Sequence, residues 1–240
     1  MSVRKKKFLK PFYKQFVLLR ENAQNRRNFI KKFKKKKWEK LIFYLKKKLY
    51  KRKKLVDQGK FKLSKFASLG NSMKKTFRNS LRAGKRFNLF YGGLSKRYLK
   101  IKIKLILKKK PKLFDNSYIY LIKFFESRLE TVLYRAQFTL SIRNARQLIY
   151  HGHILVNSKT VTSKSYLLKE GDIISIKPKS KKLIENNLRK SFFWPIPARH
   201  LMINYNTLEI LITSMSNEEF LECFPYFLDI NYVIEHYTRH

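Results

Sequence analysis

The side chains with the clearest chemical use lie between residues 128 and 164, where cationic and amide-bearing residues recur at short intervals. An arginine guanidinium binds two phosphate oxygens at once, and amides and imidazoles add directed hydrogen bonds. This combination is typical of phosphate recognition on a folded nucleic acid. The candidate nucleic-acid-binding residues of this segment are Arg128, Arg135, Arg143, Arg146, Gln147, His151, His153, Asn157, Lys159 and Lys164.

Metal binding and catalysis find little support in the same residues. His151 and His153 are two positions apart, but no cysteine lies near them and the acids are distant, so a polar surface explains the pair better than a metal site. Neither Ser141 nor Cys223, the only cysteine, has a general base beside it in the sequence. A lone cysteine also excludes an intramolecular disulfide. We therefore expect no catalytic residue, metal or cofactor.

Two predicted helices and three short strands position the candidate residues. Residues 125–136 repeat apolar side chains at helical spacing, and on that helix Arg128 and Arg135 would lie two turns apart along one side. A second helix should begin after Ser141, a good N-cap, and end at Gly152, which favours the left-handed conformation. Strands are expected at 153–157, 159–162 and 173–177.

The charge of the chain points to a polyanionic partner. Lysine and arginine total 57 against 15 acidic residues, a net charge of +42, and residues 1–110 hold 40 of the basic residues but only three of the acids. Such a chain repels itself unless a polyanion neutralises it, which favours nucleic acid over an anionic membrane surface. No run of about 18 uncharged apolar residues exists, so no membrane-spanning helix is expected.

The first half adds a second basic group. Residues 1–75 form a basic extension in which lysine runs alternate with aromatics such as Trp38 and Phe43, which either stack on bases or pack on protein. Residues 66–76 are expected to be a loop. Residues 76–122 are basic and helical, with breaks at 91–93 and Pro111. The candidate nucleic-acid-binding residues there are Arg82, Lys85, Arg86, Lys96 and Arg97.

The C-terminal part resembles an ordinary folded protein in its balance of charges. In chain order we expect a polar helix after 178, an extended stretch at 194–197, a strand or paired turn within 200–212 and a short helix at 218–224. The extended stretch follows from its two prolines, since each disfavours α geometry in the residue before it.

Several motifs hold a fixed spacing: ESRLE (126–130), VLYR (132–135), ARQLI (145–149), HGHILVN (151–157), SY (165–166) and GD (171–172). Together they resemble the RNA-binding domain of the small-subunit ribosomal protein S4 family. The resemblance extends through both flanks to cover residues 76–240, in motifs at 90–95, 97–98, 194–195, 201–204, 208–209, 229–231 and 235–237.

The resemblance implies an α+β fold. A mainly helical domain would be made from both flanks, residues 76–122 and 179–240, and would carry an inserted RNA-binding module at 123–178. In that module two helices pack on a small antiparallel sheet.

The sequence departs from the family pattern at three places. Ile142 stands where the family has a basic residue, and Arg143 follows one position later, which is about 100° around a helix. The family's Asn-Gly turn is Asn157-Ser158, and the cysteines that bind zinc in some members are absent.

The function that the resemblance implies is structural. It is that of a non-enzymatic constituent of the small ribosomal subunit, which binds small-subunit rRNA, assists assembly and supports translation. The implied partners are rRNA, neighbouring small-subunit proteins and mRNA near its entrance, and no membrane.

Two alternatives keep the module but change the function. An RNA-modifying enzyme, such as a pseudouridine synthase, would need a separate catalytic domain with an acidic nucleophile, and few residues or acids are available for one. A non-ribosomal RNA-binding protein would lack the C-terminal tail. Composition and a start at Met1 without a secretory signal favour an organelle-encoded protein, of the mitochondrion more than the plastid.

Overall fold

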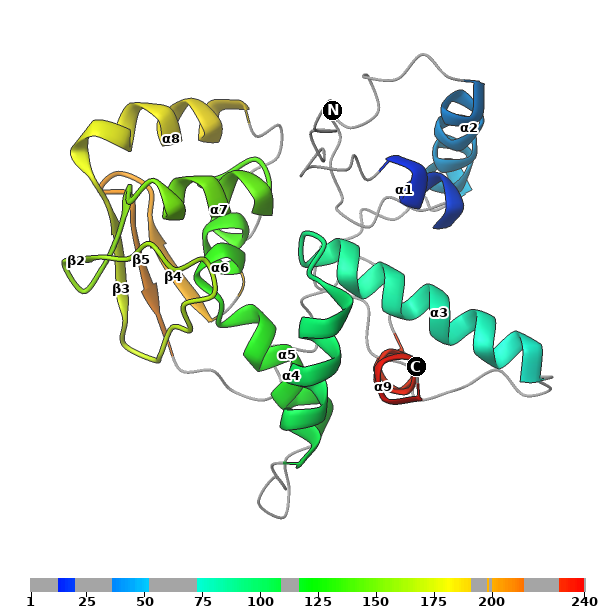
Figure 1. The fold of residues 1–240 in the computed structure, drawn as a ribbon. Coiled ribbons are helices and arrows are strands. Elements are labelled where there is room, and N and C mark those ends of the chain that lie inside the picture. The colour runs from blue at the N-terminus through cyan, green and yellow to red at the C-terminus, as the bar shows by residue number, and fades with distance from the viewer. Residues whose placement is uncertain are drawn as a thin grey trace, which may run out of the picture.

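A computed structural model describes residues 13–19, 36–51, 73–108, 117–190, 198, 200–213 and 229–239. Within these ranges the chain forms nine helices and one five-stranded sheet, an α+β architecture (Figure 1). The helices are α1 Tyr13–Leu19, α2 Lys36–Lys51, α3 Met73–Phe90, α4 Lys96–Lys108, α5 Ser117–Glu126, α6 Leu129–Arg135, α7 Ile142–Tyr150, α8 Pro178–Lys190 and α9 Ile230–Arg239. The strands are β1 Ile154–Val156, β2 Lys159–Thr160, β3 Ile173–Ile176, β4 Leu201–Asn204 and β5 Glu209–Ile212.

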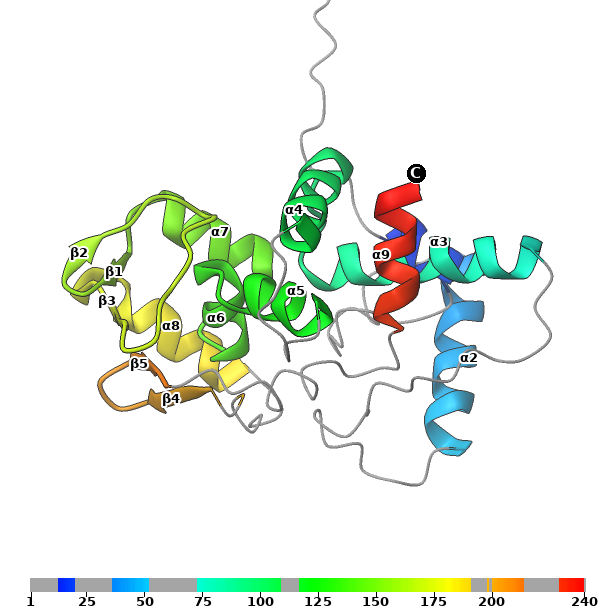
Figure 2. The same cartoon turned by 90° about the horizontal axis from the view of Figure 1, so that it is seen from below.

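A helical body joins the two flanks of the chain, because α9 packs against α3 and α4 (Figures 1 and 2). Gly84 permits the close approach, since a Cβ atom there would lie 2.2 Å from Cδ2 of His236. The Tyr237 hydroxyl donates a hydrogen bond to the Gly84 carbonyl at 3.2 Å. Burial raises the pKa of that hydroxyl, so it stays a donor at neutral pH.

The sheet is antiparallel throughout, in the order β2-β1-β3-β5-β4. The three strands predicted within the module are confirmed. β1 turns into β2 through Asn157 and Ser158, whose φ angles of 48° and 64° are both positive, so the tight turn forms with serine in place of glycine. The Asn157 side chain stabilises this turn: its Nδ2 donates to Asp172 and its Oδ1 accepts from the Ile173 amide.

The hairpin β4–β5 was expected as a strand or paired turn and is confirmed, but its location was not foreseen. Residues 201–212 were assigned to the helical domain, whereas β5 pairs with β3 of the module. The predicted polar helix, α8, also packs on the module, since Ile184 is fully buried and the Asn187 amide donates to the Phe138 carbonyl at 3.2 Å. Strand pairing and helix packing therefore connect residues beyond 178 with the predicted module.

The predicted helix at 125–136 is interrupted, which corrects the sequence interpretation. α5 ends at Glu126, and Arg128 is extended, with φ −74° and ψ 132°. The backbone there pairs with another segment instead: the Leu129 amide donates to the Tyr166 carbonyl, and the Leu168 amide donates to the Ser127 carbonyl. Arg128 and Arg135 therefore do not lie along one helix.

The second module helix, α7, forms as predicted. The Ser141 hydroxyl accepts a hydrogen bond from the Asn144 amide at 3.1 Å and caps the N-terminus. At the other end Gly152 has a φ of 69°, and the amides of Gly152 and His153 donate to the Ile149 and Leu148 carbonyls. These paired bonds are the Schellman termination.

The described part of the N-terminal extension packs on the helical body. Phe16, Trp38 and Leu41 are buried together with Leu89 of α3, so Trp38 packs on protein, whereas the side chain of Phe43 is 70% exposed. The predicted break at 91–93 is confirmed by a turn after α3. α3 already begins at Met73, so residues 73–76 are helical and not part of a loop, and the rest of the predicted loop lies outside the described residues.

Several expectations lie outside the described residues: the break at Pro111, the extended stretch at 194–197, the helix at 218–224 and the environment of Cys223. Among the helices that are described, none is long and apolar enough to span a membrane.

Candidate nucleic-acid interface

α7 has a buried side and a polar outward side. Ile142, Ala145, Leu148 and Ile149 are buried against the module core. On the outward side Arg143 is partly exposed, and Gln147 and Tyr150 are exposed. These three residues lie at positions i, i+4 and i+7, so they share one helical face. Burial and the neighbouring Arg146 guanidinium lower the pKa of Arg143, because both disfavour its charge.

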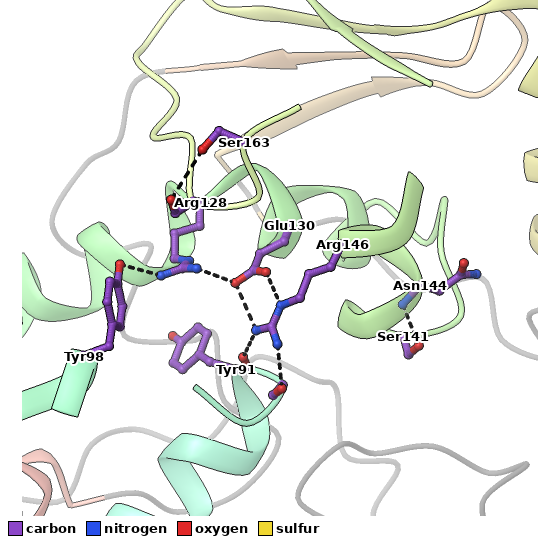
Figure 3. Close-up of polar contacts among 10 residues, drawn as sticks. Tyr91, Tyr98, Arg128, Glu130, Ser141, Asn144, Arg146 and Ser163 are labelled. Atoms are coloured by element: carbon purple, nitrogen blue, oxygen red, sulfur yellow. Dashed lines mark hydrogen bonds and ion pairs between the residues drawn. The ribbon is translucent and has the colours of Figure 1, made fainter. Parts of the chain in front are cut away.

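Glu130 is the centre of a buried charge network (Figure 3). Its carboxylate accepts from Arg128 Nη2 at 2.7 Å and from both Nε and Nη2 of Arg146. Arg146 also donates to the carbonyls of Tyr91 and Gly92, at 3.0 Å and 2.9 Å, and Arg128 donates to the Tyr98 hydroxyl at 2.7 Å. One carboxylate therefore connects α6 and α7 with the turn between α3 and α4.

A second buried carboxylate, Glu126, binds Arg135. Arg135 Nε and Nη2 donate to its two oxygens at 3.0 Å and 2.8 Å, and the Tyr91 hydroxyl donates at 2.8 Å. Burial raises the pKa of the Glu126 carboxyl, but the opposing effects of Arg135, His200 and the Tyr91 hydrogen bond are larger together, and the net pKa is lowered. The carboxylate is thus charged at neutral pH.

Three of the predicted RNA-binding arginines make internal contacts in the structure. Arg128, Arg135 and Arg146 were expected on the binding surface, but their side chains are 2%, 15% and 20% exposed and bind internal carboxylates. A buried carboxylate without a counter-charge destabilises the folded state, and each of these guanidinium groups supplies that counter-charge. Their main contacts are structural.

The remaining predicted residues are more accessible. Exposed side chains belong to Arg82, Lys96, Arg97, Gln147, His151, Asn157, Lys159 and Lys164. Partly exposed side chains belong to Lys85, Arg86, Arg143 and His153. Of these, Asn157 bonds within its turn, and His153 Nδ1 lies 2.8 Å from the Ser180 hydroxyl. Their contacts with RNA stay predictions.

The start of α7 packs against the turn after α3. Ile142, at the start of α7, packs on Gly92 so tightly that a Cβ atom on that glycine would lie 2.8 Å from Ile142 Cγ2. Ile142 is therefore a packing residue, whereas its neighbour Arg143 is partly exposed on the outward side of α7. Lys96 and Arg97 begin α4 a few residues after the same turn.

Sequence reasoning missed two features of this region. Tyr150, outside the predicted set, has a side chain that is 77% exposed at the end of α7. Glu126 and Glu130 received no role, although two acids four residues apart in a basic chain were a signal for buried ion pairs. Among the described residues, no group of three or more His, Cys, Asp or Glu side chains is placed to hold a metal ion.

Comparison with known proteins places the region in a family. Residues 127–174 match the family model described as S4 domain. The chain is 40% identical over 141 residues to small ribosomal subunit protein uS4m of Reclinomonas americana. The aligned region is 54% of this chain and 52%, about half, of that protein. It is 34% identical to uS4 of Pelagibacter ubique, over 66% of this chain and 75% of that protein.

A further relative is matched over more of its length. Small ribosomal subunit protein uS4m of Marchantia polymorpha is 31% identical, over 75% of this chain and 89% of that protein. Because the S4 domain model matches and the chain covers 75% and 89% of two relatives that are more than 30% identical, this chain belongs to the uS4 family of small ribosomal subunit proteins.

Proposed function

We propose that this protein is a non-enzymatic structural constituent of the small ribosomal subunit, which binds small-subunit rRNA, assists its assembly and so supports translation. The observation that carries the proposal is the outward face of α7, which lies within the matched S4 domain and presents Arg143 and Gln147. α7 carries no acidic residue, so nothing on this helix repels a phosphate. The relatives' names supply the ribosomal context.

The buried network supports this function by making the surface rigid. Because Glu130 connects both halves of the fold, the cations at the start of α4 keep a fixed position relative to α7. A preorganised set of donors loses less conformational entropy on binding, and folded RNA is recognised largely by shape.

We further propose that the RNA-binding module includes α8, β4 and β5. It would comprise the described residues from 127 to 213, and the helical domain would comprise 73–126 and 229–239. The support is the pairing of β3 with β5 and the contact of α8 with Phe138.

The proposed partners are small-subunit rRNA, neighbouring small-subunit proteins and mRNA near its entrance, with no membrane involved. The proposed location is the mitochondrial ribosome. The uS4m relatives in Reclinomonas and Marchantia support it, although bacterial relatives are also similar. Sequencing the rRNA that purifies with the tagged protein decides between mitochondrion and plastid.

Equilibrium binding of the purified protein to transcribed small-subunit rRNA tests the function. Lys159→Glu should weaken binding and make the slope of log affinity against log salt less steep, because each neutralised phosphate of a duplex contributes about 0.9 to that slope. The matched control is Lys108→Glu, the same change at the exposed far end of α4 (Figure 1). Equal losses from both variants would indicate nonspecific charge attraction and contradict the proposed site.

A further inference from the structure

The end of α7 exposes an aromatic ring that packing does not explain. Tyr150 is 77% exposed, so its ring contributes little to the packing of the core and is available for contact. Its ring lies 6.0 Å from that of His151 at an interplanar angle of 84°. The His151 ring in turn stacks on His153, at 6.0 Å and 29°. Three rings therefore follow one another at the point where the helix meets the sheet.

The backbone under these rings is fixed. Gly152 takes a φ of 69° and terminates the helix with the two hydrogen bonds described above. The next residue, His153, contacts the Ser180 hydroxyl of α8, and its carbonyl accepts from the Lys177 amide at 3.0 Å. A tyrosine on such a support has only two side-chain torsions to order, so binding through its ring costs little entropy.

The neighbours of Tyr150 on its helical face are polar or cationic. Gln147 lies one turn before it, Arg143 lies two turns before it, and α7 has no acid. Large contiguous apolar patches mark many protein-docking surfaces, and the neighbours of Tyr150 along α7 do not form one. An isolated ring beside an amide and a guanidinium instead suits a nucleotide, whose base stacks while its phosphate meets the cation.

We propose that Tyr150 is a stacking platform for an unpaired nucleobase of the bound RNA, with the sugar–phosphate chain running along Gln147 and Arg143. This inference rests on the proposed rRNA-binding function and deepens it. It assigns the end of α7 to a bulged or single-stranded nucleotide, whereas the lysines and arginines contact phosphates of any sequence.

Binding of Tyr150→Ala and Tyr150→Phe to transcribed small-subunit rRNA at fixed salt tests the platform. Alanine should weaken binding by about 5- to 150-fold, since base–aromatic stacking is worth about 1–3 kcal/mol per base. Phenylalanine keeps the ring and should bind within about twofold of wild type. The matched control is Tyr120→Ala, which removes a 47% exposed tyrosine on α5 and should leave binding unchanged.

Two synthetic hairpins identify what the ring contacts. One is fully paired, and the other carries a single unpaired adenosine. Wild type should prefer the bulged hairpin, and Tyr150→Ala should lose that preference.

Three results would overturn the platform. They are normal rRNA binding by Tyr150→Ala, equal losses in the alanine and phenylalanine variants, or no preference of wild type for the bulge. Normal rRNA binding with failure to incorporate neighbouring proteins into the subunit would assign the ring to a protein contact. If wild type itself fails to bind the rRNA, the proposed function fails instead.

Discussion

Arg128 and Glu130 form an ion pair of 2.7 Å between side chains that are 2% and 1% exposed. The same carboxylate binds Arg146, so two guanidinium groups depend on one acid. In a chain with a net charge of +42, this buried carboxylate neutralises two guanidinium groups that come from different segments of the fold. The family's RNA-binding module is thereby attached to the helical body by buried charge as well as by apolar packing.

Glu130→Ala should destabilise the protein by about 3–5 kcal/mol, because it leaves buried guanidinium groups without their anion. Urea unfolding followed by circular dichroism measures the loss. Glu185→Ala removes an exposed acid on α8 and should change stability by less than about 0.5 kcal/mol. Similar stability of the two variants would contradict a structural role for the network.

Arg146 and Gln147 are adjacent in the sequence but should respond oppositely to the same substitution. Arg146→Glu puts a second carboxylate beside buried Glu130 and should destabilise the fold in the absence of RNA. Gln147→Glu lies at an exposed position and should keep the stability of wild type. It should weaken rRNA binding at least about fivefold through repulsion of phosphate. Thermal unfolding and equilibrium binding of both variants provide the comparison.

If Arg146→Glu proved as stable as wild type, the internal contacts of Arg146 would carry little energy. If Gln147→Glu bound rRNA normally, the outward face of α7 would not be the contact surface.

Stability should fall in acid partly through Glu126. Its pKa is lowered in the folded state, so its contribution is complete above the ordinary value of 4.5 and is lost as the pH falls through the folded-state value. Wild type should therefore exceed Glu126→Gln in free energy of unfolding at pH 7, and the difference should shrink below pH 4.5. Urea unfolding across that range measures the difference. A constant gap at every pH would contradict the assignment.

The contact between α3 and α9 predicts a coupled pair of variants. Gly84→Ala should destabilise by about 1–3 kcal/mol, because the added methyl group overlaps the His236 ring. Combining it with His236→Ala removes the ring, so the two effects should be less than additive in a double-mutant cycle. Additive changes in the free energy of unfolding would show that Gly84 and the His236 ring of α9 are not in direct contact.

The sequence predicted the elements that depend on local chemistry. α7 was recognisable from its apolar spacing, its Ser141 cap and its Gly152 terminus, and the strands from alternation next to turn residues. The break at Ser127 and Arg128 was not, because neither is a helix breaker and the break depends on pairing with residues 166–168. The pairing of β5 with β3 could not be predicted either, since strand pairing joins segments that are distant in the sequence.

For the candidate interface, too, the sequence predicted what depends on local periodicity and missed what depends on tertiary contacts. Helical periodicity placed Gln147 on the outward side, where it is exposed. It could not show that Arg128, Arg135 and Arg146 pair internally, since the acids that they bind are brought near by tertiary folding. Burial of those acids is a property of the assembled core, not of any one segment.

Sedimentation of the tagged protein through a density gradient tests the central claim most directly. Cell or organelle extract is fractionated with ribosomal subunits intact, and the protein and the rRNA are followed in each fraction. Membership of the small ribosomal subunit predicts that the protein comigrates with small-subunit rRNA and shifts with it when subunits are dissociated. Migration as free protein, or with particles that lack small-subunit rRNA, would contradict it.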